Sequence, residues 1–167
     1  MKKVEFKGLD QSYYTETLEN GLQVYVIPYE NKNQYHVSLV TKFGSDDTSF
    51  IPEGEKKMAT VPNGIAHFLE HKMFETEKGE DPFTFFSKTG CDSNAYTSYT
   101  QTAYILSGTE SFETNLDYLL TYVNSPYFTD ENVEKEKGII AEEIKMYDDD
   151  PERALMEKMR QATYQVD

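Results

Sequence analysis

The segment His67-Phe68-Leu69-Glu70-His71 organises this sequence. If the segment is helical, at about 100° per residue, the side chains of His67, Glu70 and His71 project from one stripe of the helix surface. The opposite stripe of the same helix is mostly apolar. The pattern therefore predicts a helix with one side packed on a core and one side free for chemistry.

The polar stripe carries the residue types that metal-assisted hydrolysis needs. Two imidazoles one helical turn apart can hold one ion, and zinc accepts neutral imidazole nitrogen in tetrahedral sites. A carboxylate beside such an ion can take a proton from water and pass it to a leaving group. We interpret His67 and His71 as zinc ligands and Glu70 as a general base. The alternative is an ordinary solvated helix face.

A second helix, expected over residues 130–147, places two carboxylates, Glu136 and Glu143, within its apolar face. They are seven residues apart and so lie within about 20° of each other around the helix. A buried ionised carboxylate costs several kcal/mol unless a cation or donors compensate it, and the predicted metal lacks an oxygen ligand. The helical phase favours Glu143 over Glu142, which falls toward the solvated side. The alternative is a hydrated helix edge.

Composition limits the classes of partner. The 167 residues carry a formal charge of −14, which opposes binding to nucleic acid or to an anionic membrane. No apolar run is long enough to span a membrane, and none follows the N-terminal lysines, so we expect a cytoplasmic protein. The single cysteine, Cys91, fits a reducing compartment; we interpret it as a small buried residue rather than a nucleophile.

Turn and cap residues predict the other elements. Asn20-Gly21 predicts a hairpin over residues 12–29 with a two-residue type I′ turn, and His36 is expected to have a local partner in a largely buried strand. Asn63 and Asp81 are expected to cap two helices, and Asp150 a third, in preference to a calcium-like cluster of residues 148–150. The predicted ranges are a strand at 34–43, a loop at 44–62, helices at 63–74 and 81–88, a strand region at 92–108, and a helix at 111–125.

Three segments together resemble the pitrilysin or insulinase family of zinc peptidases. They are the H-x-x-E-H motif, Asn-Ala-Tyr-Thr-Ser at residues 94–98, and Glu-Lys-Gly-Ile-Ile-Ala-Glu-Glu-Ile at residues 136–144. The resemblance is strongest to bacterial members related to mitochondrial processing peptidase. It implies an α+β fold, a two-layer sandwich of sheet and helices, here truncated.

The resemblance also implies a role for each matching residue. His67, His71 and Glu143 would hold Zn²⁺, Glu70 would be the catalytic base, and Glu136 would support a histidine ligand from behind. Asn94 and Ala95 would contact a peptide substrate that adds to the sheet as an extra strand. An alternative for this polar strand is an edge that is polar to avoid aggregation.

Length is the departure from the family pattern. The family has two homologous halves or subunits that close over the peptide, so residues 1–167 are expected to be an N-terminal zinc-binding peptidase domain, incomplete at its C-terminal end. The missing C-terminal half or a homologous subunit would be its partner. We predict a zinc-dependent metalloendopeptidase whose isolated fragment is inactive. The alternative is a non-catalytic peptide-binding or regulatory subunit.

Overall fold

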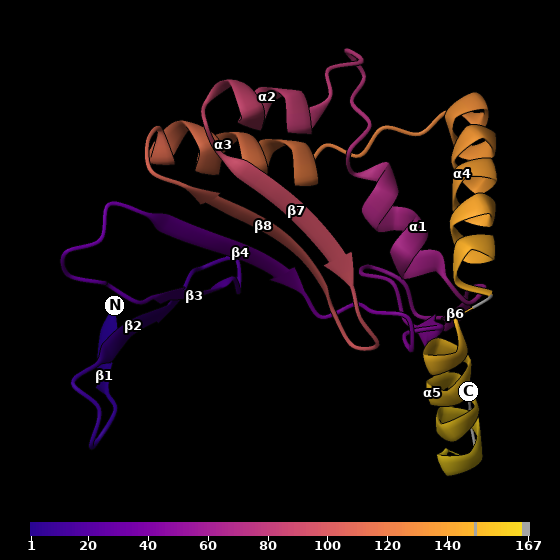
Figure 1. Cartoon of the computed structure of the whole chain (residues 1–167), viewed down its shortest axis with the longest axis horizontal. Helices are drawn as coiled ribbons and strands as arrows, with labels where there is room; N and C mark the ends of the chain where they lie inside the picture. The colour runs from indigo at the N-terminus through magenta and orange to yellow at the C-terminus, as the bar shows by residue number, and fades with distance from the viewer. Residues whose placement is uncertain (149, 165–167) are drawn as a thin grey trace. The chain divides into compact units, whose positions relative to one another are not determined.

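The computed structural model describes residues 1–148 and 150–164, except the side chains of Tyr147 and Asp148. Its contacts divide the chain into two compact units, Met1–Asn33 and Gln34–Asp167 (Figure 1). The assignment of residues 1–167 to one incomplete peptidase domain stays a prediction. Within the described residues, every helix is too short or too polar to cross a bilayer.

The first unit is an antiparallel sheet in the order β1-β2-β3, formed by Lys2–Glu5, Ser12–Thr17 and Gln23–Val26. The hairpin between β2 and β3 is confirmed, but its turn is not type I′. The amide of Gly21 donates to the Leu18 carbonyl and the amide of Leu18 to the Leu22 carbonyl, both at 2.9 Å. Only Gly21 of the predicted Asn20-Gly21 pair has positive φ, at 86°. The loop therefore has three residues, with glycine in the left-handed position.

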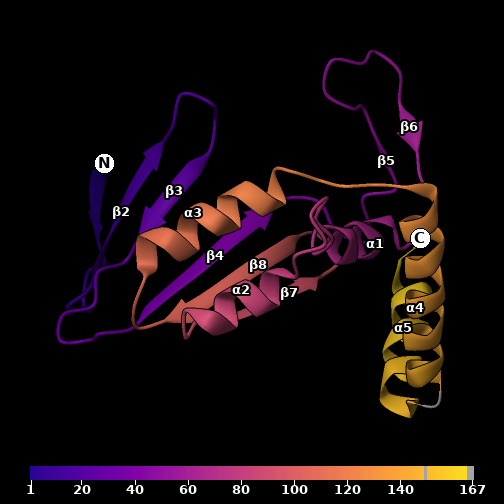
Figure 2. The same cartoon turned by 90° about the horizontal axis from the view of Figure 1, so that it is seen from above.

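The second unit is built on an antiparallel sheet in the order β4-β8-β7, with strands Tyr35–Thr41, Thr102–Gly108 and Asp92–Thr97. Figures 1 and 2 show helices α2 (Pro82–Lys88) and α3 (Phe112–Val123) over one face of this sheet. Exposure alternates along β4, which is thus half-buried rather than largely buried as predicted. His36, on its exposed face, has the predicted local partner: its Nδ1 lies 2.9 Å from Ser107 Oγ.

The core of this unit lies between the sheet and the two helices. Its buried members come from α2, β8 and α3, together with the cysteine; they are Phe86, Cys91, Tyr104, Leu106, Leu119 and Tyr122. The Phe85 and Tyr118 rings stack on one side of it, with centroids 3.8 Å apart. Cys91 is 5% exposed within this core, as expected for a small buried residue.

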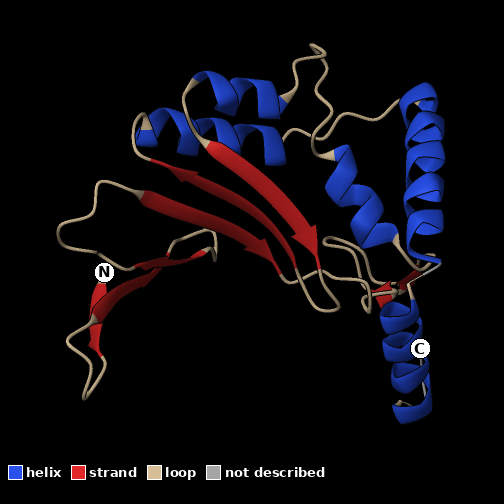
Figure 3. Ribbon diagram, in the orientation of Figure 1, coloured by secondary structure: helices blue, strands red, loops and turns tan. Residues whose placement is uncertain are grey.

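Three more helices complete the unit: α1 (Ile65–Lys72), α4 (Asp130–Asp148) and α5 (Pro151–Thr163) (Figure 3). Asp81 caps α2 and Asp150 caps α5 through bonds to backbone amides, as predicted. The calcium-like alternative for residues 148–150 lies partly outside the described residues. The cap predicted for α1 is wrong, because Gly64 takes that position with φ 85° and no side chain accepts a bond there.

The predicted fold class, α+β with helices layered on a sheet, is confirmed by this architecture. The predicted loop at residues 44–62 contains a short two-stranded ladder, β5 (Ser49–Phe50) with β6 (Ala59–Thr60). Strand β7 pairs with β8 alone among the described strands, so it lies at an edge of its sheet. α1 packs beside both β7 and α4, which brings the H-x-x-E-H motif between a sheet edge and the glutamates of α4.

Candidate metal centre

His67 and His71 lie one turn apart on α1, and Glu143 reaches them from α4. The Nε2 atoms of the two histidines are 3.1 Å apart. The Glu143 carboxylate lies 3.7 Å from Nε2 of His67 and 3.5 Å from Nε2 of His71. One ligand atom from each of the three residues thus lies within 4.8 Å of the others.

These separations suit a tetrahedral metal site. Zinc ligands lie about 2.0–2.1 Å from the ion, which places two ligands of a tetrahedron about 3.3–3.4 Å apart. The two Nε2 atoms are 3.1 Å apart, and the nearest carboxylate oxygens, Oε1 to His67 and Oε2 to His71, are 3.7 and 3.5 Å away, all close to that value. Imidazole nitrogen and carboxylate oxygen are also the ligand types that zinc accepts. The residues present therefore fit a zinc ion.

Glu136 holds one of the histidines from behind. Its Oε1 lies 2.8 Å from Nδ1 of His71, and the residue is only 5% exposed. A carboxylate accepts from an N–H, so in a neutral His71 whose Nδ1 donates to Glu136 the lone pair is on Nε2, the nitrogen nearest Glu143 and His67. This is the arrangement in which an outer carboxylate fixes the tautomer and orientation of a metal-binding histidine.

Glu70 is buried next to this group, with 8% of its surface exposed. The Thr97 hydroxyl, on β7, donates to Glu70 Oε2 at 2.8 Å. Burial raises the pKa of Tyr104, and the negative charge of Glu70 raises it further, so this tyrosine keeps its proton near the carboxylate. Sequence reasoning did not single out Thr97, although its place two residues after Ala95 puts both side chains on one face of β7.

Asn94 and Ala95 lie on the same edge strand, as predicted. Asn94 is exposed, and its Oδ1 accepts a bond from the Ala95 amide at 2.9 Å. The two residues are thus near one another on β7, while Thr97 is the residue of this strand that hydrogen-bonds to Glu70. The substrate-binding role of Asn94 and Ala95 stays a prediction.

Lys72 was not anticipated as a buried residue. It follows His71 directly and is fully buried, and its Nζ pairs with Glu75 Oε2 at 2.5 Å and lies 5.9 Å from the centre of the Phe128 ring. Lys72 lies about 140° around the helix from His67, within the apolar stripe of α1. This position is the sequence signal that could have predicted its burial. The ring contact ties the end of α1 to the segment that precedes α4, whereas the ion pair stays within three residues of sequence.

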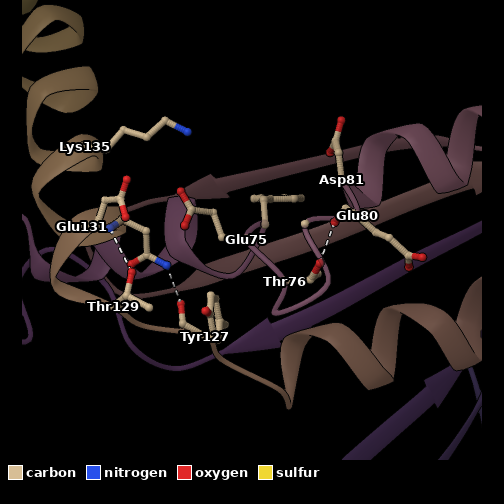
Figure 4. A pocket seen from close by; sticks show the side chains of 11 residues that line it. Glu75, Thr76, Glu80, Asp81, Tyr127, Thr129, Glu131 and Lys135 are labelled. Atoms are coloured by element: carbon tan, nitrogen blue, oxygen red, sulfur yellow. Dashed lines mark hydrogen bonds between the residues drawn. The ribbon is translucent and has the colours of Figure 1, made fainter.

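A pocket of about 530 Å³ opens beyond this ion pair, between the end of α1 and the start of α4 (Figure 4). Charged side chains of both signs line it, among them Glu75, Glu131 and Lys135. None of the predicted ligands belongs to its lining. This pocket is therefore separate from the candidate metal centre formed by α1 and α4.

Comparison with known proteins gives the context of this centre. The sequence model of the family described as Insulinase (Peptidase family M16) matches residues 50–167. The chain is 50% identical over 155 residues to a Bacillus subtilis protein named Uncharacterized zinc protease YmfH, covering 93% of this chain and 36% of that protein. A second B. subtilis protein, Uncharacterized zinc protease YmxG, is 33% identical over 69% of this chain and 29% of its own length.

Solved structures similar to this chain are also peptidases by name. An M16-like peptidase from Alicyclobacillus acidocaldarius superposes with a TM-score of 0.82 at 45% identity, over 89% of this chain and 35% of that one. A protease from Helicobacter pylori superposes with a TM-score of 0.65 at 28% identity, over 82% of this chain and 32% of that one. The chain thus spans about a third of the length of these relatives. The predicted zinc cofactor agrees with the names of the relatives and with the ligand set on α1 and α4. With its motif helix, its glutamate helix and strands β7 and β8 within the matched region, the chain belongs to the insulinase family of peptidases, family M16.

Proposed function

We propose that this chain supplies the metal centre of a zinc-dependent metalloendopeptidase, with His67, His71 and Glu143 as the zinc ligands. The observation that carries the proposal is the approach of three ligand atoms from two helices to within 4.8 Å of one another. Membership of a peptidase family and the names of the relatives support it. Zinc, when bound, supplies Lewis-acid activation of water and of a peptide carbonyl.

Glu70 is the proposed general base. Its carboxylate accepts the proton of the attacking water and later gives it to the amine that leaves from the cleaved peptide bond. Its low exposure, 8%, limits competing contacts with solvent, and the Thr97 bond holds one oxygen in place. Glu136 has a different role, because it contacts the back of the His71 ring and keeps Nε2 turned toward Glu143.

The free edge of β7 is the proposed place for the peptide. An extended peptide can add to such an edge through main-chain hydrogen bonds. The Asn94 side chain accepts from the Ala95 amide, so a peptide carbonyl would compete with Asn94 Oδ1 for that donor. The peptide would then run along the strand that also carries Thr97, next to the proposed base.

The wider setting is also proposed. Because the chain spans 36% of its 50%-identical relative, the remainder of the protein, or a homologous subunit, would close over the peptide. A cytoplasmic location stays a prediction. The alternative, a non-catalytic peptide-binding subunit, is less well supported, because the chain has both histidines and Glu143 in one group and Glu70 on the same helix as the histidines.

The proposal is tested by Glu70→Gln in the full-length protein. We expect the variant to keep its zinc and to lose about 10²–10⁴-fold in kcat, because the amide cannot accept a proton. Zinc content by mass spectrometry and cleavage of a quenched fluorescent peptide measure the two effects. If the wild-type protein binds zinc and peptide without cleaving it, the non-catalytic alternative is correct. Turnover retained by the variant would exclude Glu70 as the base.

A further inference from the structure

The bond between Thr97 and Glu70 joins the edge strand to the metal helix. Thr97 Oγ1 lies 2.8 Å from Glu70 Oε2, and the acceptor residue is 8% exposed. Thr97 itself is half-buried, and its neighbour across the strands is Thr102, which is 3% exposed. The contact is therefore shielded from water, where a single hydrogen bond constrains a side chain more than it does at the surface.

The direction of this bond follows from the number of hydrogens available. A hydroxyl has one hydrogen to donate. Thr102 donates its hydrogen to the Phe43 carbonyl at 2.9 Å. The Thr102 oxygen then stands 3.3 Å from Thr97 Oγ1 with no hydrogen of its own to offer. Thr97 therefore keeps its hydrogen for Glu70, the shorter contact and the charged acceptor.

The backbone of Thr97 faces the opposite way from its neighbours on the strand. The Ser98 amide donates to the Gln101 carbonyl at 2.8 Å, so this opposed pair is hydrogen-bonded. Pairs in an antiparallel ladder alternate, so the next pair, Thr97 with Thr102, is not hydrogen-bonded to each other. The main-chain N–H and C=O of Thr97 thus point to the free edge of β7.

The same alternation applies two residues earlier. Ala95 is also in a pair without mutual hydrogen bonds, and its amide is bonded by the Asn94 side chain instead of by β8. Ala95 and Thr97 therefore present their main chains to the edge and their side chains to the face that carries α1. Of these two side chains, that of Thr97 has the hydroxyl that reaches the carboxylate.

We propose, resting on the peptidase function proposed above, that Thr97 is a positioning residue that fixes the Glu70 carboxylate relative to a peptide on the β7 edge. Its main chain faces the place of the peptide, and its hydroxyl holds the base. One residue, Thr97, thereby sets the distance between the peptide and the base. Small displacements of a reacting group cost large factors in rate, so loss of this bond lowers kcat rather than peptide affinity.

Thr97→Val tests the inference in the full-length protein, because valine keeps the shape and removes the hydroxyl. Thr97→Ser keeps the hydroxyl and serves as the rescue. Thr89→Val is the matched control: Thr89 is also half-buried, and its hydroxyl lies 2.8 Å from both the Phe86 carbonyl and Asn115 Oδ1, within hydrogen-bonding distance of either. Zinc content, Tm, kcat and KM are measured for all three, and the crystal structure of Thr97→Val is determined.

We expect Thr97→Val to lower kcat by about tenfold or more, with KM and zinc content within about twofold of wild type. Thr97→Ser recovers most of that loss, Thr89→Val changes Tm but not kcat, and the crystal structure shows the Glu70 carboxylate moved from residue 97. An unchanged kcat in Thr97→Val, or no recovery in Thr97→Ser, overturns the inference. Glu70→Gln separates the two proposals: if it is inactive while Thr97→Val is fully active, only the role of Thr97 is wrong.

Discussion

Glu142 and Glu143 are adjacent in sequence but lie in different environments. Glu142 Oε1 pairs with Lys145 at 2.6 Å, and its side chain is 73% exposed. The Glu143 side chain is 30% exposed and directed at the two histidines. The helical phase that favoured Glu143 as the ligand thus agrees with where the side chains lie.

This difference predicts opposite outcomes for two matched substitutions. Glu143→Gln removes a charged ligand and is expected to weaken zinc binding by about 10²-fold or more, whereas Glu142→Gln leaves it within about twofold. Titration of each variant against a competing chelator measures the effect. Release of zinc by Glu142→Gln alone would show that the ligand assignment is wrong.

At the scale of elements, α4 differs from its prediction in one respect. Its buried glutamate, Glu136, faces α1 as expected, but Ile139, Ile144 and Met146 are 46%, 54% and 76% exposed. The described residues of the chain therefore cover only part of the apolar face predicted for this helix, where Val133 and Ile140 are half-buried. The pattern indicated correctly which residues share a face, and only the neighbouring elements decide which part of that face is buried.

Two buried tyrosines, Tyr104 on β8 and Tyr122 on α3, are expected to make the fold less stable at alkaline pH. Burial raises the pKa of Tyr104 and Tyr122 above the ordinary value of 10.0. The folded state then holds these protons more tightly than the unfolded state, so their stabilisation is complete below pH 10.0 and is lost as pH rises further.

The unfolding free energy of Tyr122→Phe is accordingly expected to fall less steeply with rising pH than that of wild type. The difference in slope is about 1.4 kcal/mol per pH unit, because one titrating proton has been removed. Denaturant unfolding is followed by circular dichroism from about one pH unit below to about two units above the ordinary tyrosine pKa, and the dependence of the unfolding free energy on pH gives this slope. Tyr29→Phe, at a tyrosine that is 62% exposed, is the control. Equal slopes in Tyr122→Phe and wild type would contradict the assignment.

At the scale of the whole molecule, the chain is much shorter than its relatives. The chain covers 36% of one relative and 35% of a solved one. The metal centre, the base and the β7 edge all lie within Gln34–Asp167, so the proposed site is assembled here. In the proposed function, the remainder of the protein or a homologous subunit closes over a peptide on that edge.

We therefore expect the isolated 167-residue chain to bind zinc but to cleave peptides at less than about 1% of the full-length rate, because a peptide that is not enclosed is poorly oriented. Zinc content and peptide cleavage are measured side by side on the two proteins. Cleavage by the isolated chain at a rate similar to that of the full-length protein would show that the remainder is dispensable.

The sequence by itself predicted the three residues that the structure brings together as a candidate metal centre, and the order of most elements. Helical periodicity is a local property, so it placed His67, Glu70 and His71 on one stripe and Glu136 with Glu143 on another. Turn and cap chemistry is also local, and it located the hairpin and the starts of α2 and α5.

Only the tertiary structure decided which of these stripes meet and what supports them. The distance of 2.8 Å between His71 and Glu136 spans 65 residues of sequence, and that between Thr97 and Glu70 spans 27. The burial of Lys72 depends likewise on the Phe128 ring, which belongs to the segment before α4. Local periodicity gives the direction of a side chain from its own helix or strand, but its partner is fixed by the packing of separate elements, which is a property of the whole unit.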